Sequence, residues 1–346
     1  MPLSLTSPIF ATEIQEIKEL GDHGNVWLLK GHNDDKVVIK HEGREADVFK
    51  SANPAIKAIA PQAALKILKP EELQALNRYI AGFAASEMDY QILGMPLSAS
   101  EKKAIKSLKY RLGLAQKNGW PFVKMAAVNV MDLGGALEKR MAGDKSDLQA
   151  FTNTLNAPGG LERLGKILAA DLFVTNFDRF CPKEYLHGRQ TNMNLGGVTL
   201  YLRCLLNIGN VFQIDTGSGV EVGAMDFIWP KEGFENINTP LADAERVGGE
   251  WMGRLLADRR RREEYAKDVV HDLEAVLSPR KHVLSMKSKL NPDAARRVAN
   301  GMVEGAKLIK ASLESKHGWR FKGGEVAPSK WTPGIEDRYK VMCQVL

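Results

Sequence analysis

The chain has 346 residues, of which 44% are hydrophobic and 26% are charged, and its formal net charge is +6. These values are typical of a soluble globular protein with room for two domains, each with its own core. No run approaches eighteen apolar residues, so no membrane span is expected.

The cysteines and the N-terminus indicate a reducing compartment. Cys181, Cys204 and Cys343 are too scattered for a disulfide framework, and the first ten residues lack the features of a Sec signal peptide. We predict a cytoplasmic location. Export to a host cell by a non-Sec route, as a secreted effector, is an open alternative.

Three short strands are predicted near the N-terminus, over residues 14–20, 26–29 and 37–40. The three-residue spacing of apolar residues in the first would favour a helix on its own. The glycine loop and the turn residues that follow favour a β-meander instead. Gly21 and Gly24, between the first two strands, fit either a phosphate-binding loop or an ordinary hairpin turn.

Lys40 ends the third strand, where its ammonium would stand at the end of an apolar β-branched run. It fits an edge-strand lysine, or a lysine that pairs with nucleotide phosphates and is itself held by a glutamate. A short helix is predicted over residues 44–52, and Asn53-Pro54 ends it. Glu45, near the start of this helix, is preferred over Glu42 as the partner of Lys40.

Residues 64–118 are rich in helix-forming and charged residues, with predicted helix starts at Pro70 and at Ser98. The stretch 122–131 is then predicted to form a strand. Asp132 to Gly135 breaks that strand, which is typical of a hinge between two lobes, and any strand–turn–helix join fits equally well. In the hinge interpretation, the backbone of Met131 and Leu133 would bind adenine.

The stretch 161–219 contains most of the candidate catalytic and metal-binding residues. Its apolar residues predict a helix over 161–172, followed by the polar motif Asn176-Phe177-Asp178-Arg179. Two strands are then predicted, 198–206 and 211–214, joined as a hairpin by a turn at 207–210. The second strand ends on Asp215-Thr216-Gly217. A phosphotransferase needs one aspartate to bind the acceptor hydroxyl, and an amide and a second carboxylate to bind magnesium. This stretch contains candidates for all three in that order.

The remaining residues are predicted to be helical over 241–256, 261–277 and 292–313. The densest basic run, Arg259 to Arg262, fits a solvated helix face, or a surface for an acidic or phosphate-rich partner. Nucleic acid is not expected as a partner, because aromatic residues are not interleaved with this run.

Taken together, the Lys40 meander, the Glu45 helix, the hinge-like segment and the Asn-Phe-Asp-Arg and Ile-Asp-Thr-Gly motifs resemble the protein-kinase-like fold. The resemblance covers roughly residues 14–220 and is closest to the atypical branch with actin-fragmin kinase, and more distantly to the phosphatidylinositol kinases. It implies an α+β chain with a small β-rich N-lobe over residues 1–131 and a larger helical C-lobe over residues 132–346.

By this resemblance the chain is an ATP- and Mg²⁺-dependent kinase of protein serine or threonine. Asp178 would handle the acceptor hydroxyl, with Asp171 as the less favoured alternative. Lys40 would hold the phosphates and Glu45 would anchor it, while Gly21 and Gly24 would cover them. Asp215 would bind the metal.

The metal-binding asparagine departs from the family pattern, because a long loop follows Asp178. With Asn207 and Asn210 placed in a hairpin turn, Asn194 is preferred over Asn192 as the amide ligand. Three other interpretations stay open: a kinase of lipids or small molecules, a nucleotidyl transferase on the same fold, and a catalytically silent binding module.

Overall fold

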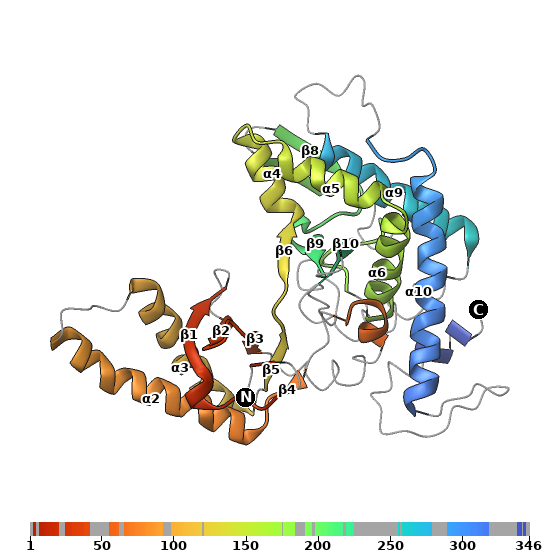
Figure 1. Cartoon of the computed structure of the whole chain (residues 1–346). Coiled ribbons are helices and arrows are strands. Elements are labelled where there is room, and N and C mark those ends of the chain that lie inside the picture. The colour runs from red at the N-terminus through yellow and green to blue at the C-terminus, as the bar shows by residue number, and fades with distance from the viewer. Residues whose placement is uncertain are drawn as a thin grey trace. The chain divides into compact units, whose positions relative to one another are not determined.

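The computed structural model describes residues 3–4, 7–20, 25–41, 55–61, 66–92, 98–119, 121–174, 176–183, 191–195, 198–216, 219–224, 255–256, 258–278, 289–317, 338–340 and 342–343. The chain forms two compact units (Figure 1). The first contains residues 1–53 and 64–127, and the second contains residues 54–63 and 128–346.

The first unit is built on an antiparallel sheet with the strand order β1-β2-β3-β5-β4. Strands β1 (Ile14–Glu19), β2 (Val26–Gly31) and β3 (Lys36–His41) form the predicted meander, which is confirmed. Strand β5 (Phe122–Ala126) pairs with β3 and with the short β4 (Lys66–Ile67). A 3-10 turn, η1 (Ala11–Glu13), leads into β1.

Two helices, α2 (Pro70–Ile92) and α3 (Ala99–Asn118), complete the described part of this unit. The predicted start of α3 is confirmed, because Ser98 and Glu101 form a reciprocal capping box. Helix α3 packs against β1, and the indole N–H of Trp27 donates to Ser107 Oγ at 3.0 Å. The core contains Trp27, Leu108 and Phe122, all fully buried.

A buried ion pair crosses this core. Lys124 on β5 donates to Glu72 Oε1 on α2 at 2.7 Å, and both side chains are almost fully buried. The Lys124 ammonium also donates to the Ser7 carbonyl at 2.6 Å. Glu72 accepts further hydrogen bonds from the backbone N–H groups of Ile9 and Lys69. No local sequence pattern predicts this pair, and its contacts tie the N-terminal segment and α2 to the sheet.

The second unit has a three-stranded sheet in the order β10-β9-β6, among the described residues. These strands are β6 (Asn129–Asp132), β9 (Phe212–Asp215) and β10 (Val220–Gly223). A separate ladder pairs β7 (Thr191–Leu195) with β8 (Val198–Leu202). Its longer described helices are α4 (Leu133–Met141), α5 (Ser146–Asn156), α6 (Gly160–Val174), α9 (Arg259–Leu277) and α10 (Ala294–His317).

The prediction of an α+β chain with a sheet in its N-terminal part and a helical C-terminal part is confirmed. The single strand predicted over 122–131 is wrong, because β5 and β6 belong to different sheets and to different units. The prediction that residues 132–135 form a break between the strand and the next helix is wrong as well. Asp132 caps α4 by accepting from Gly135 N at 2.7 Å, so both glycines lie in the first helical turn.

Two further predictions concern the rest of the chain. The helix over 44–52 and most of the helix over 241–256 lie outside the described residues. No helix in the described ranges is long and apolar enough to cross a membrane.

Helices α6 and α10 pack with their backbones in close contact, and glycines make this possible. A Cβ on Gly301 of α10 would lie 2.1 Å from the Glu162 carbonyl oxygen of α6. A Cβ on Gly165 of α6 would lie 2.1 Å from the Val298 carbonyl oxygen of α10. The close approach brings the buried face of α6 onto α10 and fixes the helix that leads into the Asn176–Arg179 motif.

Replacing Gly301 by alanine should therefore destabilise the protein by about 3 kcal/mol, the upper end of the usual range for overpacking, because backbone atoms would have to move. Gly113, in the exposed face of α3, is the matched control, since an added Cβ would meet nothing within 4 Å. Gly113→Ala should stabilise the protein by about 0.5–1 kcal/mol. Urea unfolding followed by circular dichroism measures both, and equal midpoints for the two variants would contradict the expectation.

Candidate functional site

The loop after α6 is fixed by Asn176, which contacts the residues on both sides of it. Its backbone N–H donates to the Asp171 carbonyl at 2.7 Å and so ends the helix. Its side-chain amide donates to Asp171 Oδ1 at 3.0 Å, and its side-chain oxygen accepts from Asp178 N at 3.2 Å. An asparagine that bonds the backbone two residues ahead forms a tight polar turn. This turn sets the direction of the Asp178 side chain.

Asp178 receives two amide groups from a segment about thirty residues further along the chain. Asn210 Nδ2 donates to Asp178 Oδ2 at 2.6 Å, and Asn207 Nδ2 donates to the same oxygen at 3.2 Å. Asp178 is half-buried, and among the described residues its Oδ1 accepts no hydrogen bond. The carboxylate is thus held through one oxygen, which leaves the other for a further donor.

Asp171 has a different environment from Asp178. It is buried at 1% exposure, and both of its oxygens accept from Arg179 Nη1. Burial raises the pKa of Asp171 to about 6, against the lowering effect of Arg179. At neutral pH the carboxylate is therefore mainly ionised and paired. These contacts favour a structural role for Asp171 and leave Asp178 as the accessible carboxylate.

Arg179 connects this buried pair to Asn210. Its Nε donates to the Asn210 carbonyl oxygen at 2.6 Å, while its guanidinium binds Asp171 on α6. Neighbouring residues of one motif therefore hold Asn210 at two points: Asp178 at the side-chain amide and Arg179 at the backbone carbonyl. Among the described residues the side-chain oxygen of Asn210 accepts no hydrogen bond, so it is oriented and still able to bind a ligand.

The predicted hairpin of residues 198–214 is wrong. Strand β8 pairs with β7, whereas β9 pairs with β6 and β10. Residues 208–210 form a 3-10 turn, η3 (Ile208–Asn210), which Asn207 caps by accepting from Gly209 N at 3.0 Å. The segment leading into η3 pairs instead with the Asp178 loop, through a bridge between Phe180 and Leu205.

Asn192 and Asn194, the predicted amide ligands, lie in β7 opposite Tyr201 and Thr199. The structure does not describe their side chains, and their metal role stays a prediction. The sequence pattern of residues 207–210 predicts a turn that contains Asn207 and Asn210. Their contact with Asp178 depends on a pairing between distant segments, which the sequence pattern did not reveal.

Asp215 is the last residue of β9, the strand that directly follows η3. Its neighbours in the sheet are Asn129 on β6 and Val220 on β10, and its side chain is exposed. The turn to β10 is closed by Thr216, whose backbone N–H and hydroxyl both donate to the Gly219 carbonyl at 2.9 Å. The second unit thus contains Asp178, Asn210 and Asp215. The sequence pattern also places both aspartates in the same C-terminal part of the chain.

The residues predicted to bind the nucleotide lie in both units and in the part of the chain that the structure does not describe. Lys40 lies on β3 of the first unit, opposite Val26 and Val123, and is half-buried. Gly21, Gly24 and Glu45 lie outside the described residues. Met131 is on β6 of the second unit, and Leu133 begins α4.

Leu133 is fully buried, and its N–H donates to the Val211 carbonyl at 2.8 Å. These contacts fit a packing role for Leu133, and the adenine-binding role of Leu133 and Met131 stays a prediction.

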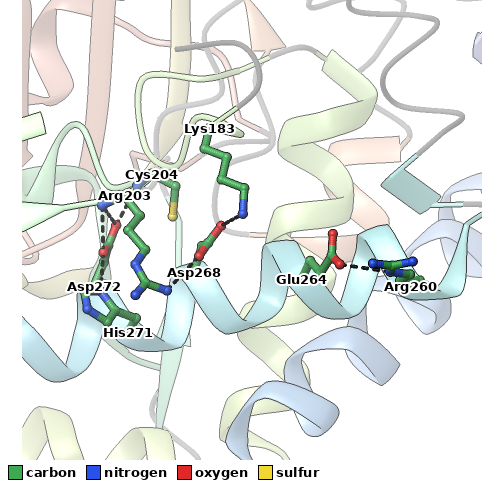
Figure 2. A network of polar contacts seen from close by, with 8 residues as sticks. All are labelled: Lys183, Arg203, Cys204, Arg260, Glu264, Asp268, His271 and Asp272. Carbon is green, nitrogen blue, oxygen red and sulfur yellow. Dashed lines mark hydrogen bonds and ion pairs between the residues drawn. The ribbon is translucent and has the colours of Figure 1, made fainter. Parts of the chain in front are cut away.

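Helix α9 binds two segments of the chain, one at Lys183 and one at Arg203 and Cys204 (Figure 2). The fully buried Asp272 accepts from the backbone N–H groups of Arg203, Cys204 and Leu205 at 2.7–2.9 Å. Burial alone would raise the pKa of Asp272, but these bonds and the His271 ring lower it. Tyr265 on the same helix donates to the Phe180 carbonyl at 2.9 Å. Asp268 binds both Lys183 and the Arg203 side chain, as Figure 2 shows.

The arginine run at the start of α9 is largely paired. Arg259 binds Glu263 at 2.8 Å and Arg260 binds Glu264 at 3.1 Å, each one helical turn away. Arg261 lies 3.8 Å from Asp258. These contacts favour the solvated-face interpretation of the run over a binding surface for an acidic partner.

The donor types present suit magnesium. Asp215 offers an exposed carboxylate and Asn210 an amide oxygen, and Mg²⁺ binds such oxygen ligands through one or two carboxylates together with substrate phosphates. Within the described ranges, no group of three or more His, Cys, Asp or Glu side chains could hold a metal ion. Asn210 precedes β9 and Asp215 ends it, so the extended strand separates their backbones by about 13 Å and one ion cannot bind both. A magnesium site at Asp215 would therefore be completed by phosphate and water.

Comparison of the chain with protein-family models, with curated proteins and with solved structures found no match in any of the three.

Proposed function

We propose that the chain is an ATP- and Mg²⁺-dependent phosphotransferase of the protein-kinase-like type, acting on serine or threonine of a protein. The observation that carries this proposal is the contact of Asp178 with the amides of Asn207 and Asn210, immediately before the strand that ends at Asp215. An accessible carboxylate for the acceptor hydroxyl and a second carboxylate for the metal are two of the groups that phosphoryl transfer requires.

Asp178 is the proposed base. The amides of Asn207 and Asn210 hold one oxygen of its carboxylate, and the second oxygen faces no donor among the described residues. In the transfer step, the acceptor hydroxyl oxygen forms a bond to the γ-phosphorus of ATP. The bond between that phosphorus and the oxygen shared with the β-phosphate breaks, and ADP leaves. The hydroxyl proton passes to Asp178 as the new bond forms.

Asp215 is the proposed carboxylate ligand of the metal. Magnesium, when bound, would neutralise phosphate charge. Asn210 lies at the other end of β9 from Asp215, and its contacts with Asp178 and Arg179 fit a role in orienting Asp178. Asn194, preferred over Asn192, is the proposed amide ligand, as the sequence predicts. Asp171 and Arg179 act as positioning residues, since they are buried and their hydrogen bonds lead to Asp178 through Asn176 and Asn210.

Lys40 is the proposed ligand of the nucleotide phosphates, with Gly21 and Gly24 as backbone contacts and Glu45 as its anchor. The position of Lys40 at the end of a buried strand supports this assignment, because Val37 to Ile39 fix the strand in the core. The buried Lys124–Glu72 pair is not a second candidate, since both groups are enclosed and fully engaged with protein.

The direct test is transfer of label from ATP by the purified full-length chain with magnesium and a mixture of protein acceptors. Label on the γ-phosphate should appear on serine or threonine, and label on the α-phosphate should not. ATP with magnesium should also raise the melting temperature, because a ligand that binds the folded state stabilises it.

Three outcomes would overturn the proposal. Transfer of the α-label would identify a nucleotidyl transferase, and transfer of γ-label only to added phosphoinositide would identify a lipid kinase. An unchanged melting temperature together with no transfer of either label would identify a silent scaffold. Each result points to one of the alternatives that the sequence leaves open.

A further inference from the structure

Helix α3 carries an unusual charge distribution on the face that points away from the sheet. Its buried residues, Ala104, Leu108, Leu112 and Ala115, recur at three- and four-residue steps and pack toward β1. The opposite face carries Lys102, Lys103, Lys106, Lys109, Tyr110, Gly113 and Lys117. We call these residues the lysine face. It contains five lysines and no acidic residue, on a chain with a net charge of only +6.

The lysines of this face lie close enough to repel one another. Lys102 and Lys106 are four residues apart, and Lys106 and Lys109 are three apart, so their ammonium groups are neighbours on the helix surface. Lys103 has an ion-pair partner, Glu19 of β1, at 3.5 Å, and is 68% exposed. Among the described residues, Lys106, Lys109 and Lys117 have no carboxylate partner.

The arginine run of α9 is a comparison case, because it is a charged helix face that is exposed to solvent. There, acidic residues one turn away neutralise Arg259 and Arg260. Among the described residues, Lys106, Lys109 and Lys117 of the lysine face lack this compensation. An uncompensated row of like charges costs stability in the free protein, and an anionic partner would recover that stability.

The chemistry of the lysine face fits a lipid surface better than other anions. Lysine ammonium groups are point charges that suit phosphate head groups, whereas nucleic-acid recognition favours the arginine fork and stacked aromatic residues. Tyr110 is the aromatic residue of this face and is 65% exposed, with a ring and hydroxyl suited to a membrane–water boundary. The twenty-residue helix is about 30 Å long, so its lysines can meet one plane together.

We infer that the lysine face of α3 docks the protein onto an anionic phospholipid membrane. The inference does not depend on the proposed phosphotransfer, because its residues lie on a different unit from Asp178 and Asp215. It also requires no membrane-spanning segment, since clustered lysines beside the surface are sufficient for electrostatic attachment.

The test is co-sedimentation of the full-length chain with vesicles. The protein should bind phosphatidylcholine vesicles that contain about one quarter phosphatidylserine, fail to bind pure phosphatidylcholine, and dissociate as the salt concentration rises. The variant Lys106→Glu/Lys109→Glu/Lys117→Glu should bind at least about 100-fold more weakly, since each lysine near such a surface contributes about fivefold. The milder variant with glutamine at the same positions should give an intermediate result.

The matched control is Lys57→Glu/Lys145→Glu/Lys307→Glu, which changes the net charge equally at exposed lysines outside α3. It should keep most of the vesicle binding, and circular dichroism melting checks that each variant is folded. Three results would overturn the inference: no binding of the natural chain at low salt, equal losses in both triple variants, or a clear preference for duplex or single-stranded nucleic acid over the vesicles.

Discussion

Replacing Asp178 by asparagine is expected to lower the rate constant of phosphoryl transfer by about 100- to 10,000-fold, the usual contribution of a positioned general base. Asparagine has the same shape, and its side-chain oxygen can still accept from Asn210 and Asn207, so the loop should keep its structure. The change removes the negative charge of the side chain and with it the capacity to take the hydroxyl proton. The affinity for ATP, measured by the rise in melting temperature, should change little.

The controls separate the chemical role from a structural one. Asp144→Asn changes an exposed carboxylate that binds Ser146 in the turn before α5, and it should leave transfer unchanged. Asp171→Asn should act differently from Asp178→Asn, because it removes the charge partner of a buried arginine and so lowers the melting temperature as well. Wild-type rates for Asp178→Asn in a protein that still transfers γ-phosphate would show that Asp178 is not the base.

The parts of the fold that could be predicted from sequence are those with a local physical cause. Apolar runs separated by turn residues were enough for the β1–β3 meander, and the Ser98–Glu101 box marked the start of α3. The apolar periodicity of α6 marked the helix before Asn176. Each signal lies within a few residues of the structure that it specifies.

Strand pairing and the Asn210 contact were not predictable in the same way. The run after Val198 shows β propensity, but propensity does not reveal whether the partner strand precedes or follows it. The neighbouring Gly134 and Gly135 suggested a break, and the Asp132 cap instead placed them inside a helix. Asn210 joins Asp178 because Asp272 and Tyr265 on α9 hold both segments, contacts that span dozens of residues.

Replacing Glu72 by glutamine is expected to destabilise the first unit by about 3–5 kcal/mol, the usual effect of removing one partner of a buried ion pair. The Lys124 ammonium is completely buried, and it would keep only neutral acceptors, the Ser7 carbonyl and the new amide. Lys124→Met should also be destabilising, because the Glu72 carboxylate would retain just the N–H groups of Ile9 and Lys69. Urea unfolding followed by circular dichroism measures both changes.

The double variant Glu72→Leu/Lys124→Met tests whether charge burial is the cause. Two apolar side chains of similar volume remove both desolvated charges, so the double variant should be more stable than either single variant. Destabilisation equal to the sum of the single changes would show that the two residues act independently. Exposed Lys139→Met, which removes a surface partner of Asp147, is the control and should cost at most about 1 kcal/mol.

The same ion pair predicts a dependence of stability on pH. Burial alone would raise the pKa of Glu72, but the hydrogen bonds from Lys124 and from the backbone N–H groups of Lys69 and Ile9 lower it below 4.5, its ordinary value. A lowered folded-state pKa means that the contribution of Glu72 is fully present above the unfolded value and is lost as the pH falls through the folded value. Glu72→Gln should remove this acid-dependent part, so the stability difference between the variant and the natural chain should shrink below about pH 4.5. A difference that stays constant across that range would show that the carboxylate charge of Glu72 does not stabilise the fold.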